Sequence, residues 1–418
     1  MPASLIINGG LPLRGSVAVS AAKNAALPCL AASLLTREPL TLDHLPYLAD
    51  VRTILRLLEL LGAEYSLSPD RRCEIEVPTV KQHEAPYELV STMRASVLVL
   101  GPLLAREGKA RVALPGGCAI GLRPIDQHLR GFEKLGAEIS IQSGYVEARA
   151  SRLKGARISL DLVTVTGTEN LLMAASLAEG TTVIENAARE PEVSDLARLL
   201  SAMGAKVEGA GTERIEIQGV SELGPAQHRI IPDRIEAGTL LVAGAITGGE
   251  VTVTGLIPDH LSATLAKLEE SGASLDIGPD WVRVKGPNRP RPVDLITNPF
   301  PGFATDMQAQ FMALLGLGDG VSRITETIFE NRFMHAAELR RMGARIETDG
   351  AVAVVRGVDH YEATQVMASD LRASASLVLA GLVARGTTTV SRVYHLDRGY
   401  ERMEEKLRSL GAEIKRVS

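Results

Sequence analysis

The chain has 418 residues, which at roughly 150 residues per domain suggests two or three domains. Its apolar fraction of 45% and charged fraction of 23% are typical of a globular protein in water. The net charge of −5 and the aromatic fraction of 3% exclude a nucleic-acid-binding protein that relies on a basic surface and stacked aromatic rings.

The cysteines and the N-terminus predict a soluble cytoplasmic protein. Cys29, Cys73 and Cys118 are too few for a disulfide-stabilised fold, which favours a reducing compartment. The N-terminal segment lacks the basic start and long apolar core of a signal peptide. The longest apolar runs, Ala95–Ala105 and Ser376–Ala384, are shorter than a membrane-spanning helix.

Taken in chain order, the sequence repeats one unit six times. A Gly-Ala pair follows an amphipathic segment in every copy, with spacings of 74, 68, 68, 71 and 68 residues, at Gly62, Gly136, Gly204, Gly272, Gly343 and Gly411. A second marker, a turn followed by β-branched residues, keeps the same period from Thr36 to Ala384. Two independent markers with one period predict a true internal repeat.

Each copy predicts the same order of elements. An apolar helix is followed by a short strand, a loop, an amphipathic helix that ends at the Gly-Ala pair, and a hairpin. The second copy has them at residues 94–108, 110–114, 124–137 and 138–150, with Pro124 expected in the first turn of its second helix. The glycine of each pair is expected to cap its helix in the left-handed conformation.

These copies predict an α/β protein of two domains with three units each, because six units of about 70 residues exceed one hydrophobic core. The last copy stops after AEIKRVS, so SLIINGG and GSVAVS near the N-terminus are expected to supply its missing hairpin partner and lead-in strand. The predicted domains are residues 22–229, and residues 1–21 together with 230–418. A repeat array that serves only as a scaffold is the alternative to an enzyme.

Charged residues stand near the N-termini of the apolar helices, where free N–H groups suit an anion. They are Lys23 with its neighbour Asn24, Arg94, Asp306, Asp370 and Arg372. Their equivalent positions indicate an anion-binding cleft between the two domains. Salt bridges between copies, for instance Asp370 with Arg372, are the alternative.

The loop at residues 114–124 of the second copy predicts a reactive cysteine. Gly116, Gly117 and Gly121 open the backbone around Cys118, and Arg123 lies just before the next helix. A thiol near an arginine and a helix N-terminus has a lowered pKa, which suits a nucleophile or proton donor. Cys29 is expected in the core and Cys73 in a hairpin strand, both without a chemical role.

The equivalent loops of other copies add Arg189, Arg332 and Arg398, which together suggest a polyanionic substrate. Asp306 is the most plausible base, because a carboxylate among arginines stays ionised. No metal site is expected, since His228, His260 and His335 are scattered and no CxxC motif occurs. The glycines form neither a P-loop nor a dinucleotide-binding motif.

Nine motifs then resemble a known family in order and spacing. They are SAAKNAALP, TMRAS, LPGGCAIGLRPID, ENAAREPE, PDRIEAGT, FATDMQAQF, TIFENRFMH, ASDLRASASLVLAG and YHLDRGYER. They are similar to the UDP-N-acetylglucosamine 1-carboxyvinyltransferases, a branch of the enolpyruvyl transferases, and the PGGC loop separates them from the sister 3-phosphoshikimate 1-carboxyvinyltransferases. The resemblance implies two inside-out α/β barrel (prism) domains with the active site in the cleft between them.

The resemblance also implies a reaction. The enolpyruvyl group of phosphoenolpyruvate would pass to the 3′-hydroxyl of UDP-N-acetylglucosamine by addition and elimination through a tetrahedral intermediate, which releases phosphate. This is the first committed step of peptidoglycan synthesis and the target of fosfomycin. No metal or organic cofactor, nucleic acid or membrane takes part.

Site residues follow from the matching positions. Lys23, Arg123 and Arg398 would bind phosphoenolpyruvate, Asn24 would position substrate, Cys118 would donate a proton or form an adduct, and Asp306 would be the base. The UDP-sugar would contact Arg94, Arg123, Pro124, Ile125, Asp126, Gln127, Val163, Thr164, Val165, Thr166 and Ile328, and the cleft would be lined by Arg332, Asp370, Leu371 and Arg372.

Leu162 departs from the family, because some members carry a lysine there beside the diphosphate. The contacts of 163–166 are therefore expected to rely on backbone groups and Thr164. The glycines around Cys118 also suggest that this loop and the two domains close over bound sugar nucleotide.

Overall fold

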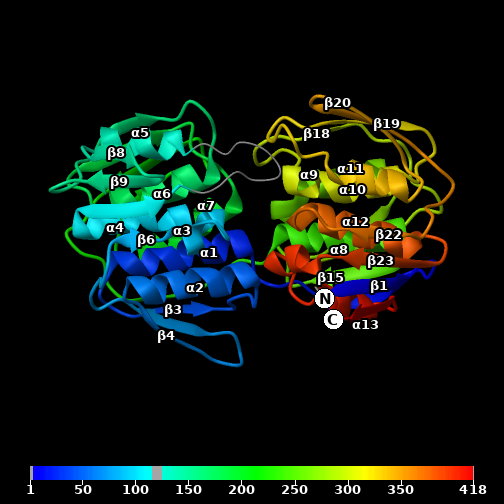
Figure 1. Ribbon diagram of the computed structural model, residues 1–418, viewed down its shortest axis with the longest axis horizontal. Coiled ribbons are helices and arrows are strands. Elements are labelled where there is room, and N and C mark those ends of the chain that lie inside the picture. The colour runs from blue at the N-terminus through cyan, green and yellow to red at the C-terminus, as the bar shows by residue number, and fades with distance from the viewer. Residues whose placement is uncertain (1–2, 115–124, 418) are drawn as a thin grey trace. The chain divides into compact units, whose positions relative to one another are not determined.

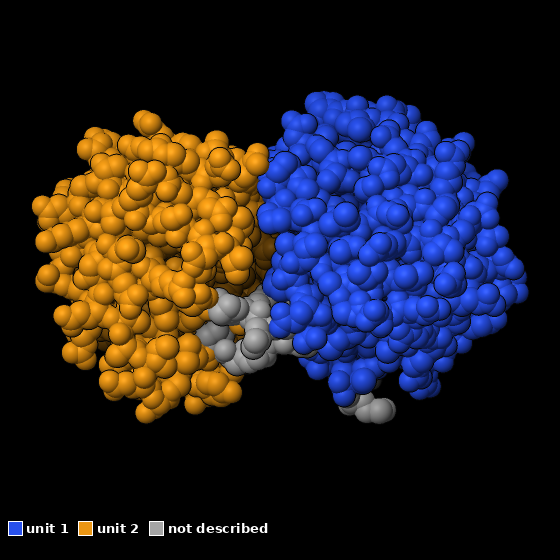
Figure 2. Space-filling model, turned by 90° about the horizontal axis from the view of Figure 1, so that it is seen from above, with its two compact units in different colours: residues 1–20, 118–122, 232–418 blue, residues 21–117, 123–231 orange. Residues whose placement is uncertain are grey.

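The computed structural model describes residues 3–114 and 125–417, and within them the chain forms two compact units. Unit 1 takes in the chain up to Ser20 and from Pro232 onward, and unit 2 runs from Ala21 to Ile231 (Figures 1 and 2). Each unit has its own hydrophobic core. No helix among the described residues is long and apolar enough to cross a membrane.

Unit 2 contains three four-stranded sheets, with strand orders β14-β3-β5-β4, β6-β7-β9-β8 and β10-β11-β13-β12. In each sheet the first two strands are parallel and the other neighbours are antiparallel. The strands are β3 (Leu40–Asp43), β4 (Glu64–Leu67), β5 (Cys73–Glu76), β6 (Glu84–Ala85), β7 (Lys109–Ala113), β8 (Glu138–Gln142), β9 (Tyr145–Arg149), β10 (Arg157–Ser159), β11 (Thr181–Glu185), β12 (Lys206–Glu208), β13 (Arg214–Gln218) and β14 (Ala226–Arg229).

Unit 1 repeats this arrangement in three further sheets, with orders β2-β15-β17-β16, β18-β19-β21-β20 and β22-β23-β1-β24. The strands are β1 (Ser4–Asn8), β2 (Arg14–Ala18), β15 (Glu250–Thr254), β16 (Ser274–Ile277), β17 (Trp281–Lys285), β18 (Leu295–Ile296), β19 (Val321–Thr325), β20 (Arg345–Asp349), β21 (Val352–Arg356), β22 (Gln365–Met367), β23 (Thr387–Ser391) and β24 (Glu413–Val417).

The N-terminal strands complete two different copies. β1 pairs with β23 and β24, which confirms that the N-terminus supplies the missing hairpin partner of the sixth copy. The expectation that the next segment also packs with that copy is wrong, because β2 pairs in parallel with β15 of the fourth copy. β14 does the same for the first copy by pairing with β3, so each unit is completed by a strand from a distant part of the chain.

The apolar helices lie inside each unit with the sheets outside them, the inside-out arrangement expected for this α/β fold (Figure 1). They are α1 (Lys23–Ala31), α4 (Leu100–Glu107) and α6 (Val165–Ser176) in unit 2, and α8 (Arg234–Ile246), α10 (Gln308–Leu315) and α12 (Leu371–Val383) in unit 1. Nearly every side chain of α1, α6, α8, α10 and α12 is buried, because these helices are apolar all round rather than on one stripe. In α4 the first five residues are buried and the last three are half-buried. None of the six sheets closes into a barrel among the described residues.

The amphipathic helices end as expected. They are α2 (Ala49–Leu61), α5 (Asp126–Lys134), α7 (Pro191–Ala202), α9 (Ser262–Glu270), α11 (His335–Arg341) and α13 (Met403–Ser409), and a further short helix, α3, spans Tyr87–Val90. The repeated glycine after each amphipathic helix has a positive φ of 92° to 118°, which confirms the left-handed cap. α5 begins at Asp126, and Pro124, which was expected in its first turn, lies outside the described residues.

Several predicted helices begin as tighter 3₁₀ turns. The segment at Arg94–Val99 is a 3₁₀ helix that leads into α4, and Thr305–Met307 leads into α10 in the same way. The other 3₁₀ segments are Ala32–Leu35, Pro258–Leu261 and Val393–Arg398. Such turns are common at helix ends and place the side chains of Arg94 and Asp306 just before a buried helix.

Candidate active site

Asp306 of unit 1 is held between two arginines. One carboxylate oxygen lies 2.8 Å from Nη2 of Arg332, and the other accepts a hydrogen bond from Nε of Arg372 at 3.0 Å. The Asp306 side chain is 24% exposed, whereas those of Arg332 and Arg372 are 5% and 2% exposed. The structure thus brings together three of the predicted site residues, of which the half-buried carboxylate is the most accessible.

The charge of this cluster fixes the protonation state of Asp306. Burial alone would raise the pKa of its carboxyl, but the guanidinium groups of Arg332 and Arg372 outweigh burial and hold that pKa well below its ordinary value. The carboxylate is therefore ionised at neutral pH, as its arginine-rich sequence context predicts. A carboxylate stabilised this strongly is also a weak proton acceptor until one arginine contact weakens.

Glu326 organises the loop that carries Arg332. One of its oxygens accepts hydrogen bonds from Thr297 Oγ1 at 2.9 Å and from the backbone N–H of Ile328 at 2.9 Å. The other accepts from Thr305 Oγ1 at 2.8 Å, and Thr305 in turn accepts from Nη1 of Arg332 at 3.1 Å. Ile328, a predicted UDP-sugar contact, is therefore fixed by the same buried carboxylate that supports Arg332.

Arg372 also packs against Tyr400. Its guanidinium carbon lies 5.1 Å from the centre of the Tyr400 ring, and the Tyr400 hydroxyl lies 3.0 Å from Thr239 Oγ1. The Gln310 amide donates to the Tyr400 hydroxyl at 3.1 Å and to the backbone carbonyl of Asp306 at 2.9 Å. Arg372 is thus a buried support beneath Asp306.

Asp370 has a different partner from the one suggested by its spacing. Its side chain caps α12 by accepting the backbone N–H groups of Arg372 at 2.8 Å and Ala373 at 3.1 Å. The suggested salt bridge between Asp370 and Arg372 is therefore wrong. The guanidinium of Arg372 binds Asp306, and the carboxylate of Asp370 binds the helix end. Leu371 follows at the first position of α12 and is half-buried.

The remaining unit 1 residue, Arg398, ends the 3₁₀ segment Val393–Arg398 and is half-buried. Burial first, and then the positive charge of Arg398, lower the pKa of His395 in the same segment. Arg398 therefore supplies positive charge to this segment, which suits a small anion.

Lys23 and Asn24 differ in exposure although they are adjacent at the start of α1. Lys23 is 8% exposed, and its Nζ lies 3.2 Å from Oδ2 of Asp50 in the first turn of α2. Asn24 is exposed while its helix neighbours are buried. A salt bridge and an anion-binding role are compatible for Lys23, because an ammonium group has three donors.

Hydrogen bonds between uncharged side chains join α5 and α6 of unit 2. His128 of α5 is 2% exposed, with its Nδ1 3.2 Å from Nδ2 of Asn170 and its Nε2 3.4 Å from Oγ1 of Thr166. Burial first, and then the charge of Arg94, lower the pKa of His128 to about 4. Arg94 and Thr166, both predicted UDP-sugar contacts, therefore share one region with His128.

The segment before α6 is open to solvent. Leu162 and Val163 are 67% and 37% exposed, while Thr164, Val165 and Thr166 are half-buried. Thr164 caps α6 by accepting the backbone N–H of Gly167 at 3.2 Å. The side-chain oxygen of Thr164 is thus already committed to the helix end.

Ile125, Asp126 and Gln127 open α5. Ile125 and Gln127 are buried, and the Gln127 side-chain carbonyl accepts the backbone N–H of Asp161 at 2.8 Å. Gln127 and Asp161 also line a cavity of about 220 Å³ with Arg130. The structure therefore directs the Gln127 amide towards Asp161.

Three predicted site residues, Cys118, Arg123 and Pro124, lie outside the described residues. The other two cysteines are where they were expected, with Cys29 fully buried in α1 and Cys73 in strand β5. Burial raises the pKa of the Cys29 thiol well above its ordinary value, and it raises that of Cys73 to about 11. Both thiols are therefore protonated at neutral pH. Arg189, from an equivalent loop, is exposed.

Cys29 takes part in one cluster that the sequence spacing did not suggest. Among the described residues, possible metal-ligand atoms of Cys29, Asp195 and His228 lie within 4.8 Å of one another. The donor set fits a metal poorly, because His228 and Arg198 already approach the same Asp195 oxygen at 3.0 and 2.9 Å and the thiol is held protonated. The expectation of no metal stays a prediction.

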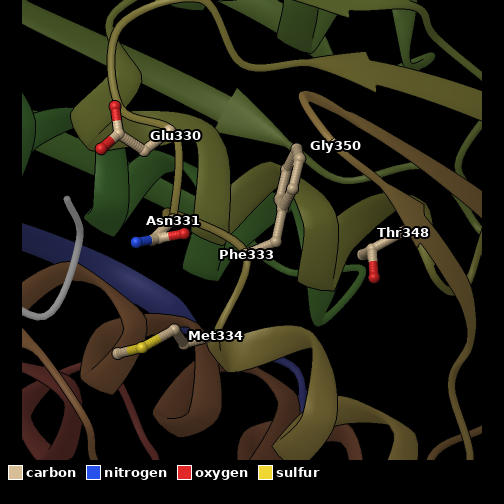
Figure 3. Close-up of a pocket in the computed structure, with 6 residues that line it drawn as sticks. All are labelled: Glu330, Asn331, Phe333, Met334, Thr348 and Gly350. Atoms are coloured by element: carbon tan, nitrogen blue, oxygen red, sulfur yellow. The ribbon is translucent and has the colours of Figure 1, made fainter.

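A shallow cavity of about 340 Å³ lies beside the loop that carries Arg332 (Figure 3). Glu330, Asn331, Phe333 and Met334 line it from that loop, and Thr348 and Gly350 line it from the β20–β21 hairpin. Arg332 lies between these lining residues in sequence but binds Asp306.

The two clusters occupy equivalent places in the repeats. Arg94 and Asp306 each lie fourteen residues before the glycine that precedes a strand, Gly108 and Gly320. Thr166 and Arg372 each lie fourteen residues before Gly180 and Gly386, and His128 and His335 each lie eight residues before Gly136 and Gly343. The repeat position that holds Arg94 and Thr166 in unit 2 therefore holds Asp306 and Arg372 in unit 1, and each unit has a buried histidine eight residues before its glycine.

Sequence reasoning missed the residues that support these clusters, which are His128, Asn170, Thr239, Gln310, Glu326 and Tyr400. The available signal was a polar residue inside an apolar helix, as at Asn170 in α6 and Gln310 in α10. Such a residue must find a hydrogen-bond partner in the core, so it marks a network even where its partner is unknown.

Comparison with known proteins agrees with this fold. The family model of EPSP synthase (3-phosphoshikimate 1-carboxyvinyltransferase) matches residues 7–407. The enolpyruvyl transferase NikO from Streptomyces tendae is similar at 28% identity and a TM-score of 0.90, over 100% of this chain and 99% of that one. An EPSP synthase from Acinetobacter baumannii shares the fold, with 17% identity and a TM-score of 0.75 over 100% of both chains. The chain therefore belongs to the EPSP synthase family of enolpyruvyl transferases, which transfer the enolpyruvyl group of phosphoenolpyruvate.

Proposed function

We propose that this enolpyruvyl transferase uses the 3′-hydroxyl of UDP-N-acetylglucosamine as its acceptor and so begins peptidoglycan synthesis in the cytoplasm. The observation that carries the proposal is the ionised, half-buried Asp306 carboxylate, which is bound by two buried guanidinium groups. The acceptor is supported by the sequence motifs, above all the PGGC loop with Cys118.

In the proposed reaction, Asp306 accepts the proton of the sugar hydroxyl as its oxygen attacks C2 of phosphoenolpyruvate. Cys118 gives a proton to C3, which becomes a methyl group in the tetrahedral intermediate. Loss of a proton from that methyl group then breaks the C–O bond to phosphate and forms the enolpyruvyl ether. Lys23, Arg123 and Arg398 hold the phosphate and carboxylate, and the steps require no metal or organic cofactor.

The arginine contacts supply a means to control the base. Proton transfer to Asp306 becomes easier when its pKa rises, and weakening the contact with either Arg332 or Arg372 raises that pKa. Arg332 lies on a loop whereas Arg372 lies in the buried helix α12, so Arg332 is the contact that bound substrate can shift. In the proposed resting state, the Asp306 carboxylate is therefore ionised and bound by both arginines.

The UDP-sugar is proposed to contact Arg94, Asn24, Ile328, and residues 123–127 and 163–166. Support comes from the exposed Asn24 and Val163, and from the positive charge of Arg94 near Thr166 and His128. Within residues 125–127, a side-chain contact from Gln127 to the sugar nucleotide has less support, because this side chain already bonds to Asp161. A backbone contact is therefore the better expectation for Gln127.

The second candidate acceptor is shikimate 3-phosphate, favoured by the description of the matching family model. The PGGC loop weighs against it. A non-catalytic repeat scaffold is a third candidate, and the combination of Lys23, Cys118, Arg123, Asp306 and Arg398 weighs against that role.

Phosphate release separates these candidates. The chain is mixed with phosphoenolpyruvate and either UDP-N-acetylglucosamine, shikimate 3-phosphate or no acceptor, and inorganic phosphate is measured over time. Release with UDP-N-acetylglucosamine alone supports the proposal. Release with shikimate 3-phosphate alone supports the second candidate, and no release with either acceptor leaves the scaffold.

Alkylation by the epoxide fosfomycin tests the role of Cys118. The thiolate is the reactive form, and a pKa of about 11 leaves Cys73 with a thiolate fraction roughly 300-fold below that of an ordinary cysteine. We expect the label on Cys118 alone, and faster labelling in the presence of UDP-N-acetylglucosamine. Peptide mass spectrometry that places it on Cys29 or Cys73 would refute the assignment.

A further inference from the structure

His128 connects the interior of unit 2 to the predicted nucleotide segment. Its ring lies between Asn170, which is fully buried in α6, and Thr166, which is half-buried in the first turn of the same helix. The imidazole of His128 therefore links a hydrogen-bonded side chain of the core to Thr166, which is nearer to solvent.

The orientation of the Asn170 amide is fixed by two backbone groups. Its Oδ1 accepts the N–H of Gly101 at 2.8 Å, and a backbone N–H is only a donor. Its Nδ2 donates to the carbonyl of Val97 at 2.9 Å, and a carbonyl is only an acceptor. A Cβ added to Gly101 would lie 2.5 Å from Oδ1 of Asn170, so this close contact requires glycine. The nitrogen of Asn170 must therefore face His128.

The tautomer of His128 follows from this orientation. Nδ2 of Asn170 is a donor, so Nδ1 of His128 must accept and carries no hydrogen. The single hydrogen of the neutral ring then sits on Nε2, which faces Oγ1 of Thr166 at 3.4 Å. Thr166 accepts this hydrogen bond, and its own hydroxyl hydrogen remains available to donate.

We propose that His128 is a positioning residue that turns the Thr166 hydroxyl into a donor for an oxygen of the nucleoside diphosphate. This inference rests on the proposed function, because it concerns the nucleotide part of that acceptor. Arg94 lies near enough for its charge to act on His128, so the hydroxyl and the guanidinium present hydrogen-bond donors in the same region. The carboxylate of Asp126 also acts on His128, and beside it these two donors suit a phosphate oxygen or a uracil carbonyl.

The His128 ring stays neutral at neutral pH, so it keeps the single tautomer with hydrogen on Nε2. Burial and Arg94 lower the pKa of His128 to about 4, although Asp126 opposes them. A neutral ring has one donor and one acceptor, so Asn170 fixes both. In unit 1 the position equivalent to Thr166 is Arg372, which already binds a carboxylate of its own chain. Thr166 is the neutral counterpart that an external acceptor can use.

Nitrogen NMR tests the tautomer without any substrate. The chain is labelled with ¹⁵N-histidine, and the signals that disappear in His128→Gln identify the ring. We expect the ring hydrogen on Nε2 at pH 7 in the wild-type chain. In Asn170→Asp the amide donor that faces Nδ1 is gone, so we expect the Nε2–H tautomer to be lost. Hydrogen on Nδ1 in the wild-type chain would overturn the proposal that His128 positions the Thr166 hydroxyl.

Nucleotide binding tests the role of the hydroxyl. Calorimetry with UDP should show a dissociation constant about 10-fold higher for Thr166→Val, whereas Thr166→Ser keeps the hydroxyl and most of the affinity. His128→Leu should lose affinity about 3- to 10-fold, and His128→Gln should restore part of it, because its amide donor reaches towards Thr166. Thr53→Val is the matched control, because Thr53 is a helical threonine of the same unit whose hydroxyl donates to the backbone carbonyl of Ala49.

The kinetic pattern separates this inference from the proposed function. In Thr166→Val the KM for the sugar nucleotide should rise while the KM for phosphoenolpyruvate stays within about twofold. An equal rise in both KM values, or a His128→Leu effect that His128→Gln does not lessen, would contradict the positioning role. Failure of the wild-type chain to bind UDP would contradict the proposed acceptor, while the NMR result would still decide the tautomer.

Discussion

The second and fifth repeats place charges of opposite sign at the same position, Arg94 in unit 2 and Asp306 in unit 1. In unit 1 the charge is compensated by two arginines of the same chain. In unit 2 the position equivalent to Arg372 holds the uncharged Thr166, whose Oγ1 lies 3.4 Å from Nε2 of His128. One repeat frame thus serves two chemical purposes, a stabilised ion in one unit and a set of donors in the other.

The two units share the burial of an equivalent histidine but differ in the charges around it. His128 and His335 are equivalent, and burial is the first cause that lowers the pKa of each to about 4. The charges around them differ, since Arg94 lowers and Asp126 raises the pKa of His128, whereas Asp370 raises and Arg332 lowers that of His335. The fold fixes the burial, and the surrounding side chains determine the function.

The largest effect is expected from breaking the ionic cluster. Asp306→Asn keeps the shape of the side chain but removes the proposed base, and general-base catalysis is typically worth about 10²–10⁴-fold in rate. We expect kcat to fall by that factor in the phosphate-release assay. Asp359→Asn removes an exposed carboxylate paired with Arg289 at 3.2 Å and is the control. An Asp306→Asn enzyme with wild-type kcat would exclude Asp306 as the base.

The two equivalent histidines predict a loss of stability in mild acid. Their folded pKa of about 4 lies below the unfolded value near 6.5, so the unfolded chain binds more protons between these values. The free energy of unfolding should fall as the pH drops from about 6.5 to 4, by roughly 3 kcal/mol for each ring.

Single variants divide this dependence between the units. His128→Gln and His335→Gln should each remove about half of the pH dependence that the double variant removes, measured by urea unfolding at several pH values. The comparison between units would fail if one variant removed all of it, because the two burials would then be unequal.

A smaller effect is expected at lower pH from Asp306. Its folded pKa lies below the unfolded value near 3.9, so its contribution is complete above about pH 4 and is lost as the pH falls further. The wild-type chain should therefore lose stability below pH 4 more steeply than Asp306→Asn. Equal slopes in urea unfolding would show that the arginines do not stabilise the carboxylate.

The smallest effect is expected from Glu326→Gln. The new amide replaces one acceptor oxygen with a donor, and so breaks hydrogen bonds to Thr305 or to the N–H groups of the 327–329 segment. The free energy of unfolding should fall by about 1–3 kcal/mol in urea, while the exposed Glu347→Gln should change it little. An unchanged Glu326→Gln protein would mean that this carboxylate does not organise the loop.

Much of the fold follows from local sequence signals. The glycine caps, the amphipathic helices and the hairpin at 138–149 depend on residues close in sequence, and the structure has them where expected. The burial of the apolar helices follows from their composition in the same way. These features require no knowledge of distant partners.

Partners across the repeat were harder to predict. β2 pairs with the fourth copy rather than the sixth, because each unit closes with a strand borrowed from elsewhere in the chain. Arg372 binds Asp306, sixty-six residues away, while the nearer Asp370 caps the helix that begins beside it. Sequence spacing gives the residue types at a site, but a long side chain takes its partner from whichever copy packs against it.

Transfer of an enolpyruvyl group to UDP-N-acetylglucosamine leaves a product that NMR detects directly. Proton and phosphorus spectra are recorded of a mixture of the chain, phosphoenolpyruvate and this sugar nucleotide. We expect new vinyl protons on the sugar nucleotide and an equal amount of inorganic phosphate. Consumption of neither substrate by a folded chain, or transfer only to shikimate 3-phosphate in a parallel tube, would contradict it.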